Sequence, residues 1–209
     1  MRITYIDFDG VIFQNKEAAN RVGTRCSQFF NKTVGIDNEK YQGSISNKMY
    51  QTFGHTVYAL KKLGYEACSD QFNTHVYKNV DPKKLVGDVD DNTRKTMKEW
   101  YNVMTELDNV LIYTDAPHDW IKMVNETYSL ELPDHVRVIS SQDLGYYKCQ
   151  WEAYTMLPGG VLIDDSLRNI STASEYETWK PVIFGQGLHS FTGDKVSMIS
   201  SPNQVLALN

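Results

Sequence analysis

The chain has 209 residues and a formal net charge of −5, from 26 acidic residues against 21 lysines and arginines. Hydrophobic residues make up 41% of it and charged residues 22%, a balance that is ordinary for a folded globular protein and excludes an intrinsically disordered one. This length fits one α/β domain with a sizeable inserted module. The acidic excess argues against a surface that wraps nucleic acid.

Cysteine usage and hydropathy bear on the cellular compartment. Cys26, Cys68 and Cys149 are an odd number at wide spacing without a CxxC pair, which fits reduced thiols better than a disulfide framework. We find neither a signal peptide nor an apolar stretch of about 18 residues. We therefore expect a cytoplasmic protein with no membrane partner, and the sequence gives no indication of its oligomeric state.

An apolar run at residues 2–6 leads directly into Asp7, Asp9 and Gly10. Two acids at positions i and i+2 of a strand point the same way. Holding like charges that close costs free energy unless a cation or a shared proton offsets it, so the pair indicates a chemical site. The alternative is a solvated Asp-x-Asp-Gly turn that merely ends the strand.

The pattern then changes from strand to helix for about ninety residues. Apolar residues at spacings of three and four predict helices at residues 16–31, 46–63, 69–78 and 91–106. We expect these helices to form a small cap, residues 14–107, inserted after the first strand. The cap contains His55 and His75, which are either substrate contacts or ordinary packing residues. One or two of its aromatic residues could stack on a base, and the others must pack the bundle: Tyr41, Tyr50, Phe53, Tyr58, Phe72, Trp100 and Tyr101.

From residue 109 the strand pattern returns. Apolar runs at residues 110–113, 136–139, 161–163 and 181–184 are separated by helical segments at 118–129, 149–156 and 167–176. Together with residues 2–6, this β-then-α alternation predicts a parallel, Rossmann-like sheet covered by helices, formed by residues 1–13 and 108–209. The tail from residue 185 is harder to place, with one more short strand or helix expected at 203–208.

Polar side chains follow three of these strands. Because ligands gather outside the carboxyl ends of parallel strands, we expect these side chains to converge on one crevice. A cluster this acidic favours a hard divalent cation with oxygen ligands, and magnesium is the natural candidate. The converging residues are Asp7, Asp9, Thr114, Asp115, Asp164 and Asp165, together with Lys148, which lies shortly before the run at 161–163.

These residues resemble the motifs of the haloacid dehalogenase-like (HAD) superfamily, which appear here as Asp7-Phe-Asp9-Gly-Val11, Thr114, Lys148 and Asp164-Asp165. The resemblance implies the HAD fold and a phosphoryl-transfer site. Asp7 would be the nucleophile that becomes an aspartyl phosphate, and Asp9 would protonate the leaving oxygen and then activate water. Thr114 and Lys148 would hold the phosphoryl oxygens, while Asp7, the backbone carbonyl of Asp9, and Asp164 would bind magnesium.

Elementary chemistry agrees with these roles. A carboxylate attacks phosphorus only if its own charge and that of the phosphate are offset, which a metal and Lys148 could do. A second carboxylate nearby gains acid character because neighbouring acids push their pKa values apart. Dehalogenase members of the superfamily lack an acid at the position of Asp9, so its presence favours phosphoryl transfer over carbon–halogen cleavage.

A narrower resemblance concerns Asp164-Asp-Ser-Leu-Arg-Asn-Ile170, which is similar to the DDSxRNI signature of the pyrimidine 5′-nucleotidase-like branch. It places Asp165, Ser166 and Asn169 around the metal ligand. The chain departs from the branch at three positions: Asp115 replaces an Asn beside the phosphate, Cys149 replaces a Pro after the lysine, and Trp120 replaces a His. His118 cannot take over the role of that His and is expected at the protein surface.

The sequence therefore predicts a magnesium-dependent phosphatase, and the branch resemblance implies a nucleoside 5′-monophosphate as substrate. Three alternatives stay open. The substrate could be a sugar phosphate or another small phosphomonoester, because inserted modules and not cores select substrates. The chain could be a catalytically quiet module that binds a nucleotide or a partner protein. It could also act on nucleic-acid ends, in which case its binding would depend strongly on salt.

Overall fold

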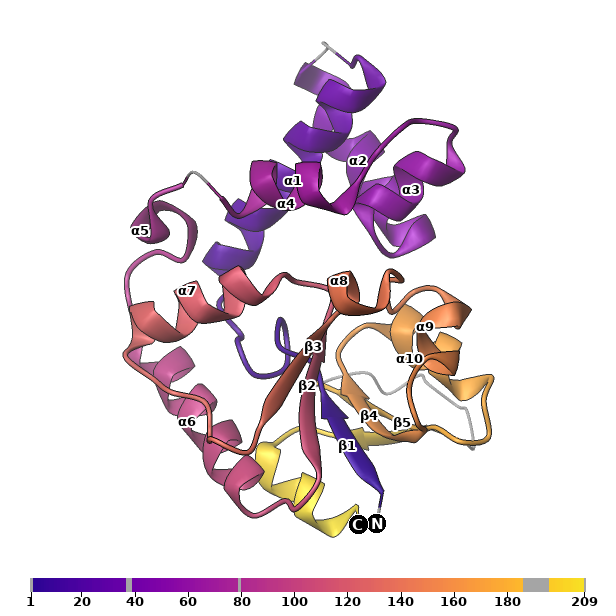
Figure 1. The fold of residues 1–209 in the computed structure, drawn as a ribbon. Helices are drawn as coiled ribbons and strands as arrows, with labels where there is room; N and C mark the ends of the chain where they lie inside the picture. The colour runs from indigo at the N-terminus through magenta and orange to yellow at the C-terminus, as the bar shows by residue number, and fades with distance from the viewer. Residues whose placement is uncertain (1, 37–38, 79, 186–195, 209) are drawn as a thin grey trace. The chain divides into compact units, whose positions relative to one another are not determined.

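The computed structural model describes residues 2–36, 39–78, 80–185 and 196–208. The chain forms two compact units, one made of Met1–Asn15 with Val89–Asn209 and one made of Lys16–Asp88 (Figure 1). We call them the sheet unit and the inserted unit. The sequence had predicted an inserted segment of residues 14–107. In the structure, the last helix of that segment, α6 (Asp91–Thr105), belongs to the sheet unit.

The sheet unit is built on six parallel strands in the order β3-β2-β1-β4-β5-β6. The strands are β1 (Ile3–Ile6), β2 (Val110–Thr114), β3 (Arg137–Ser140), β4 (Gly160–Asp164), β5 (Lys180–Phe184) and β6 (Ser197–Ile199). This confirms the Rossmann-like α/β fold and the five predicted strands. The sixth strand comes from the tail that the sequence left unplaced, of which residues 186–195 lie outside the described chain. The short element expected at 203–208 is a 3₁₀ helix, η1 (Pro202–Ala207).

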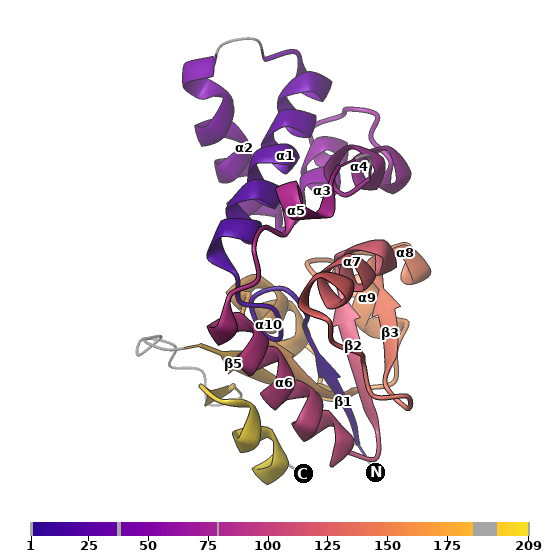
Figure 2. The ribbon, with the colours of Figure 1, turned by 90° about the vertical axis from the view of Figure 1, so that its left-hand side faces the viewer.

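Besides α6, four helices follow or connect the strands in the described residues of this unit. They are α7 (His118–Tyr128), α8 (Ser141–Leu144), α9 (Trp151–Thr155) and α10 (Leu167–Ser174). Figures 1 and 2 show α6 and η1 on one side of the sheet and α9 and α10 on the other. Both faces of the sheet are therefore covered, which is why the strands read as continuous apolar runs.

Two aromatic clusters fill these layers. On the face covered by α9 and α10, Tyr5 is completely buried, and the centroid of its ring lies 4.8 Å from that of Trp179. On the other face, the ring of Trp100 from α6 lies 5.4 Å from that of Phe184 on β5. Helical periodicity shows which face of α6 is apolar but not which element it packs against, so the sequence placed this helix in the wrong unit.

Hydrogen bonds tie together the two segments of the sheet unit that flank the insertion. The side-chain amide of Asn15 donates to Asp90 Oδ2 at 3.0 Å and to the hydroxyl of Tyr128 at 3.1 Å. Tyr128 in turn donates to Asp90 Oδ2 at 3.0 Å. The second oxygen of Asp90 caps α6 by accepting the N–H of Thr93 at 2.7 Å. The exit and return of the chain are thus fixed at one place on the sheet unit.

The inserted unit is helical: α1 (Lys16–Val34), α2 (Glu39–Phe53), α3 (Thr56–Lys62), α4 (Ser69–Val76) and α5 (Pro82–Leu85). The long helix α1 packs against each of the other four. The single helix predicted at 46–63 is wrong, because the chain breaks it at Gly54, whose φ of +81° is unfavourable for a residue with a side chain. Arg21 and Arg25 donate to the carbonyl groups at the ends of α5 and α4, which need such partners.

The aromatic residues expected in a cap have different environments. Phe72 is buried in the inserted unit, with its ring 5.4 Å from Phe29, whereas Trp100 and Tyr101 belong to the core of the sheet unit. The side chain of Tyr41 lies outside the described residues. Tyr50 is 55% exposed.

The three cysteines are free thiols: Cys149 is buried, Cys26 is half-buried and Cys68 is exposed. None of the helices in the described part of the chain combines the length and the apolar composition that a bilayer crossing requires.

His55 caps α3 in its neutral form. Its Nδ1 accepts the backbone N–H of Val57 at 3.2 Å, and its ring lies 5.0 Å from that of Phe72. Burial lowers the pKa of His55 to about 3. Protonation of Nδ1 would replace an acceptor by a donor and destroy the cap. The structure therefore gives His55 a structural role in the inserted unit.

We predict that this histidine makes the protein acid-sensitive. An unfolded histidine binds a proton below pH 6.5 and the folded one only below about 3, so between these values the unfolded state binds more protons and stability falls as the pH falls. The slope contributed by one group is at most about 1.4 kcal/mol per pH unit. Urea unfolding at several pH values should show this slope in the wild type and a shallower one in His55→Asn, which keeps a capping acceptor that does not titrate. Equal slopes would contradict the role.

Candidate active site

The central strands bring the predicted residues to one edge of the sheet. Strand β1 pairs with β2 on one side and with β4 on the other, so the order of the strands reverses at β1 and β4. Asp7 directly follows β1, Thr114 is the last residue of β2 and Asp164 is the last residue of β4. In open parallel sheets, ligands bind outside the carboxyl ends of the strands at such a reversal.

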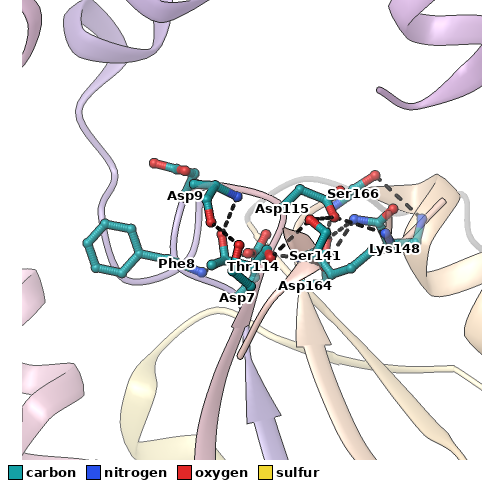
Figure 3. A network of polar contacts seen from close by, with 12 residues as sticks. Asp7, Phe8, Asp9, Thr114, Asp115, Ser141, Lys148, Asp164 and Ser166 are labelled. Atoms are coloured by element: carbon teal, nitrogen blue, oxygen red, sulfur yellow. Dashed lines mark hydrogen bonds and ion pairs between the residues drawn. The ribbon is translucent and has the colours of Figure 1, made fainter. Parts of the chain in front are cut away.

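The centre of the site is the ammonium group of Lys148, which lies between two carboxylates (Figure 3). Its Nζ is 2.7 Å from Asp7 Oδ1 and 2.6 Å from Asp164 Oδ2. The side chain of Lys148 is 1% exposed and that of Asp164 is fully buried. Because a buried charge is stable only when it is paired and hydrogen-bonded, the three side chains depend on one another.

The charges of this group do not balance. Burial, together with the charges of Asp164 and Asp165, raises the pKa of Asp7 well above its usual range, while Lys148 acts in the opposite direction. Burial lowers the pKa of Lys148, but its ion pairs with Asp164 and Asp7 more than compensate and hold this pKa well above the ordinary value. The site therefore keeps a protonated lysine and has more carboxyl groups than this one ammonium group can pair with, which adds to the effect of burial on the pKa of Asp7.

The segment after β4 holds Asp164 in a fixed orientation. The backbone N–H of Ser166 donates to Asp164 Oδ1 at 2.8 Å, and the amide of Asn169 donates to both oxygens at 3.2 and 3.1 Å. The hydroxyl of Ser166 also caps α10 by accepting the N–H of Asn169 at 3.5 Å. Ser166 and Asn169 thus lie where the sequence predicted, around the acid that ends β4.

Three carboxylates could hold a metal ion. One oxygen each from Asp7, Asp164 and Asp165 lie within 4.8 Å of one another. Oxygen donors of this kind suit magnesium, and three acids against one lysine leave a charge that a divalent cation would offset. Gly10 permits the approach of Asp165, because a Cβ at this position would lie 2.1 Å from Asp165 Oδ2 and the residue has a φ of +84°. Asp165 is therefore a possible metal ligand, whereas the sequence had predicted that it only surrounds the ligand Asp164.

Asp9 lies in the tight turn after β1. The backbone N–H of Gly10 donates to the carbonyl of Phe13, and those of Ile12 and Phe13 donate to the carbonyl of Phe8, which closes the turn. The indole N–H of Trp120 donates to Asp9 Oδ1 at 2.9 Å. Burial raises the pKa of Asp9 to about 6, against this hydrogen bond and the charge of Lys148, which lower it. The carboxyl group therefore titrates near neutral pH, as proton transfer requires.

Thr114 ends β2 and Asp115 follows it, but the two side chains face different partners. Thr114 Oγ1 accepts the N–H of Ala116 at 3.1 Å, which leaves its own O–H as a donor. Asp115 Oδ1 accepts the backbone N–H of Lys148 and the hydroxyl of Ser141, both at 2.9 Å. This carboxylate therefore holds the loop that carries Lys148, and the place beside the phosphate that the motif implies for Asp115 stays a prediction.

The structure brings together Asp7, Lys148 and Asp164, with Asp9 on the turn after β1 and Thr114 at the end of β2. Sequence reasoning missed two residues of the site. Trp120 had been noted only as a departure from a motif, and Ser141, which donates to Asp115, gave no signal in the sequence. His118 is exposed at the start of α7, with its Nε2 2.8 Å from Asp143 Oδ2, so the surface position predicted for it is confirmed.

Comparison with known proteins supports the fold. No family model matches the chain, and no curated protein sequence does. A HAD phosphatase from Thermococcus onnurineus superposes with a TM-score of 0.59 at 15% identity, over 100% of this chain and 97% of that one. A hydrolase from Pseudomonas syringae gives 0.56 at 12% identity, over 99% and 97% of the two chains.

A third structure, of the Bacillus subtilis protein YfnB bound to magnesium and described as a HAD-type hydrolase, gives a TM-score of 0.51 at 12% identity, over 99% of this chain and 97% of that one. Identities this low establish the fold and nothing finer. The protein has the HAD fold, as its motifs predicted. The resemblance to the nucleotidase-like branch rests on the sequence motif alone.

We predict that Asp115→Ala destabilises the protein more than Asp115→Asn does. The alanine leaves a backbone N–H and a buried hydroxyl without their acceptor, which costs about 1–3 kcal/mol in the free energy of unfolding. The asparagine keeps an acceptor oxygen for both donors and should cost less than about 1 kcal/mol. Chemical denaturation of the two variants and the wild type measures the difference. Equal losses would show that Asp115 does not hold the loop of Lys148.

Proposed function

We propose that the protein is a magnesium-dependent phosphomonoesterase that forms a phosphoryl-enzyme intermediate on Asp7 and acts on a nucleoside 5′-monophosphate. The observation that carries the proposal is the lysine ammonium bound between Asp7 and Asp164, with a third acid, Asp9, on the next turn. The first two acids and the lysine offer a charge-compensated nucleophile, and the third offers a proton. These are the groups that cleavage of a phosphate ester needs.

The chain can supply each part of the reaction. One oxygen of Asp7 is held by Lys148 and by the N–H of Phe8 at 2.7 Å, which fixes the carboxylate for attack on phosphorus. As the bond from phosphorus to the ester oxygen breaks, the carboxyl group of Asp9 gives its proton to that oxygen. Asp9 then takes a proton from the attacking water, and the phosphoryl group passes from Asp7 to that water. Lys148 and the hydroxyl of Thr114 offer charge and a donor to the phosphoryl oxygens.

The metal ligands in this proposal are Asp7, Asp164 and Asp165, together with the backbone carbonyl of Asp9. When bound, magnesium supplies positive charge that offsets the carboxylates and the phosphate group. The fit rests on the cluster of three carboxylate oxygens, whose acids outnumber the one ammonium group of Lys148. The magnesium-bound structure from Bacillus subtilis shares the fold, which supports this choice of ion.

The residues of the sheet unit say least about which substrate the protein acts on. All the groups described would serve any phosphate monoester equally well. The nucleotide is favoured by the run from Asp164 to Ile170, in which Ser166 and Asn169 hold the metal ligand as described above. A substrate panel therefore decides between a nucleotide and another small phosphomonoester without affecting the proposed chemistry.

We predict that Asp7→Asn abolishes phosphatase activity, with a loss of at least about a thousandfold in kcat, because a carboxamide cannot replace the nucleophile. Phosphate release should be measured on nucleoside 5′-monophosphates, sugar phosphates and a 5′-phosphorylated oligonucleotide, with the highest kcat/KM on the nucleotides. Asp108→Asn, at an exposed acid before β2, is the control and should keep full activity. Activity that survives in Asp7→Asn, or none in the wild type on any substrate, would overturn the proposal.

Magnesium should also stabilise the folded protein. At a magnesium concentration of about 100 Kd, binding to the folded state alone adds about 2.7 kcal/mol to the free energy of unfolding and raises Tm. Chelation with EDTA should reverse the shift. Asp165→Asn should reduce the shift, because it removes one of the three oxygens, whereas Asp108→Asn should keep it. The same magnesium-dependent shift in both variants would exclude Asp165 as a ligand.

A further inference from the structure

Trp120 makes a polar contact with the site although it lies on a helix outside the motifs. Its indole N–H donates to Asp9 Oδ1 at 2.9 Å, and its side chain is 1% exposed. An indole has one donor and no acceptor, so Asp9 Oδ1 must be the acceptor in this contact. Within the described residues, this is the one hydrogen bond to the Asp9 side chain, and Oδ2 is left for another partner.

Aromatic packing fixes the position of the indole. The ring of Phe13 meets Trp120 edge-on, with centroids 5.9 Å apart and an interplanar angle of 72°. Phe13 is held in turn by Phe8 at 6.1 Å and by Tyr128 at 5.8 Å. Phe8 and Phe13 belong to the turn that carries Asp9, so the turn and the donor are packed as one cluster. Because the Trp120 ring is buried and meets Phe13, it cannot rotate away without disrupting this packing.

We propose that Trp120 is a positioning residue that holds one oxygen of Asp9 so that the other is presented for proton transfer. The inference rests on the proposed function, because it assigns a purpose to a carboxyl group that acts as acid and base. The proton moves from Asp9 to the ester oxygen as the phosphorus–oxygen bond breaks, and a misplaced carboxyl group would leave that oxygen to depart as an alkoxide. The efficiency of such a transfer depends on geometry, so the donor to Oδ1 matters to catalysis without touching the substrate.

The chain offers a matched control. Trp179 is also buried, at 5% exposed, and its indole N–H donates to the carbonyl of Tyr154 at 3.1 Å in the core of the same unit. Trp120→Phe and Trp179→Phe each remove one buried indole hydrogen bond and a similar volume. A role that is only structural predicts the same consequences for both variants.

Two phosphate esters with different leaving groups test the role. A nucleoside 5′-monophosphate releases an alkoxide that needs a proton, whereas p-nitrophenyl phosphate releases a stable phenolate that does not. Trp120→Phe should lower kcat/KM about tenfold on the nucleotide and less than about threefold on p-nitrophenyl phosphate. Trp179→Phe should change the two substrates equally. An equal loss on both substrates in Trp120→Phe would overturn the proposal.

A measurement that does not depend on activity checks the contact itself. The indole N–H resonance of Trp120, assigned from its loss in Trp120→Phe, should shift in Asp9→Asn and stay in place in Asp108→Asn. An unshifted resonance in Asp9→Asn would show that the hydrogen bond is absent in solution and would overturn the inference alone. A wild-type protein without phosphatase activity would instead overturn the proposed function, and the catalytic role of Trp120 with it, even if the resonance shifts.

Discussion

The pairing of one buried ammonium group with two carboxylates is the interaction on which this site depends. Lys148 joins the residue after β1 to the last residue of β4, and each of the three charges would be costly to bury without the others. The surrounding structure supplies hydrogen bonds to every member. Asn169 and Ser166 hold Asp164, the N–H of Phe8 holds Asp7, and Asp115 holds the backbone of Lys148 itself.

The topology of the sheet makes this pairing possible. A parallel sheet with β1 between β2 and β4 places three carboxyl-terminal strand ends side by side, although the strands are far apart in the sequence. Burial of both faces gives these ends a rigid support. The acids at these strand ends outnumber the one ammonium group, so the site favours a bound cation. With that cation it can accept the phosphate group of a substrate.

Local patterns predicted the parts of this structure that local forces determine. Five strands were found because buried parallel strands read as apolar runs, and the convergence of Asp7 and Asp164 followed from the rule for strand ends, whereas Lys148 was placed there by its motif. The helix at 91–106 was found but assigned to the wrong unit, because periodicity does not identify the partner of an apolar face. The break at Gly54 was missed because helical spacing continues through it.

The orientation of single side chains could not be predicted from the sequence, because it too depends on contacts with other segments. The motif implies a place beside the phosphate for Asp115, and it gave no sign that this carboxylate accepts donors from Ser141 and Lys148. Trp120 looked like a missing histidine and proved to be the hydrogen-bond donor to Asp9. Asp165 was placed behind the metal ligands, and the close approach that Gly10 permits brings it among them. Each of these outcomes depends on contacts between segments that are distant in sequence.

The central claim is that Asp7 carries the phosphoryl group during turnover. The most direct measurement is to mix the protein with magnesium and substrate, quench with acid within the first turnover, digest, and search for the phosphorylated peptide by mass spectrometry. The account predicts one added phosphoryl group on Asp7, absent when the substrate or magnesium is omitted. Turnover without this modification, or the phosphoryl group on another residue, would contradict it.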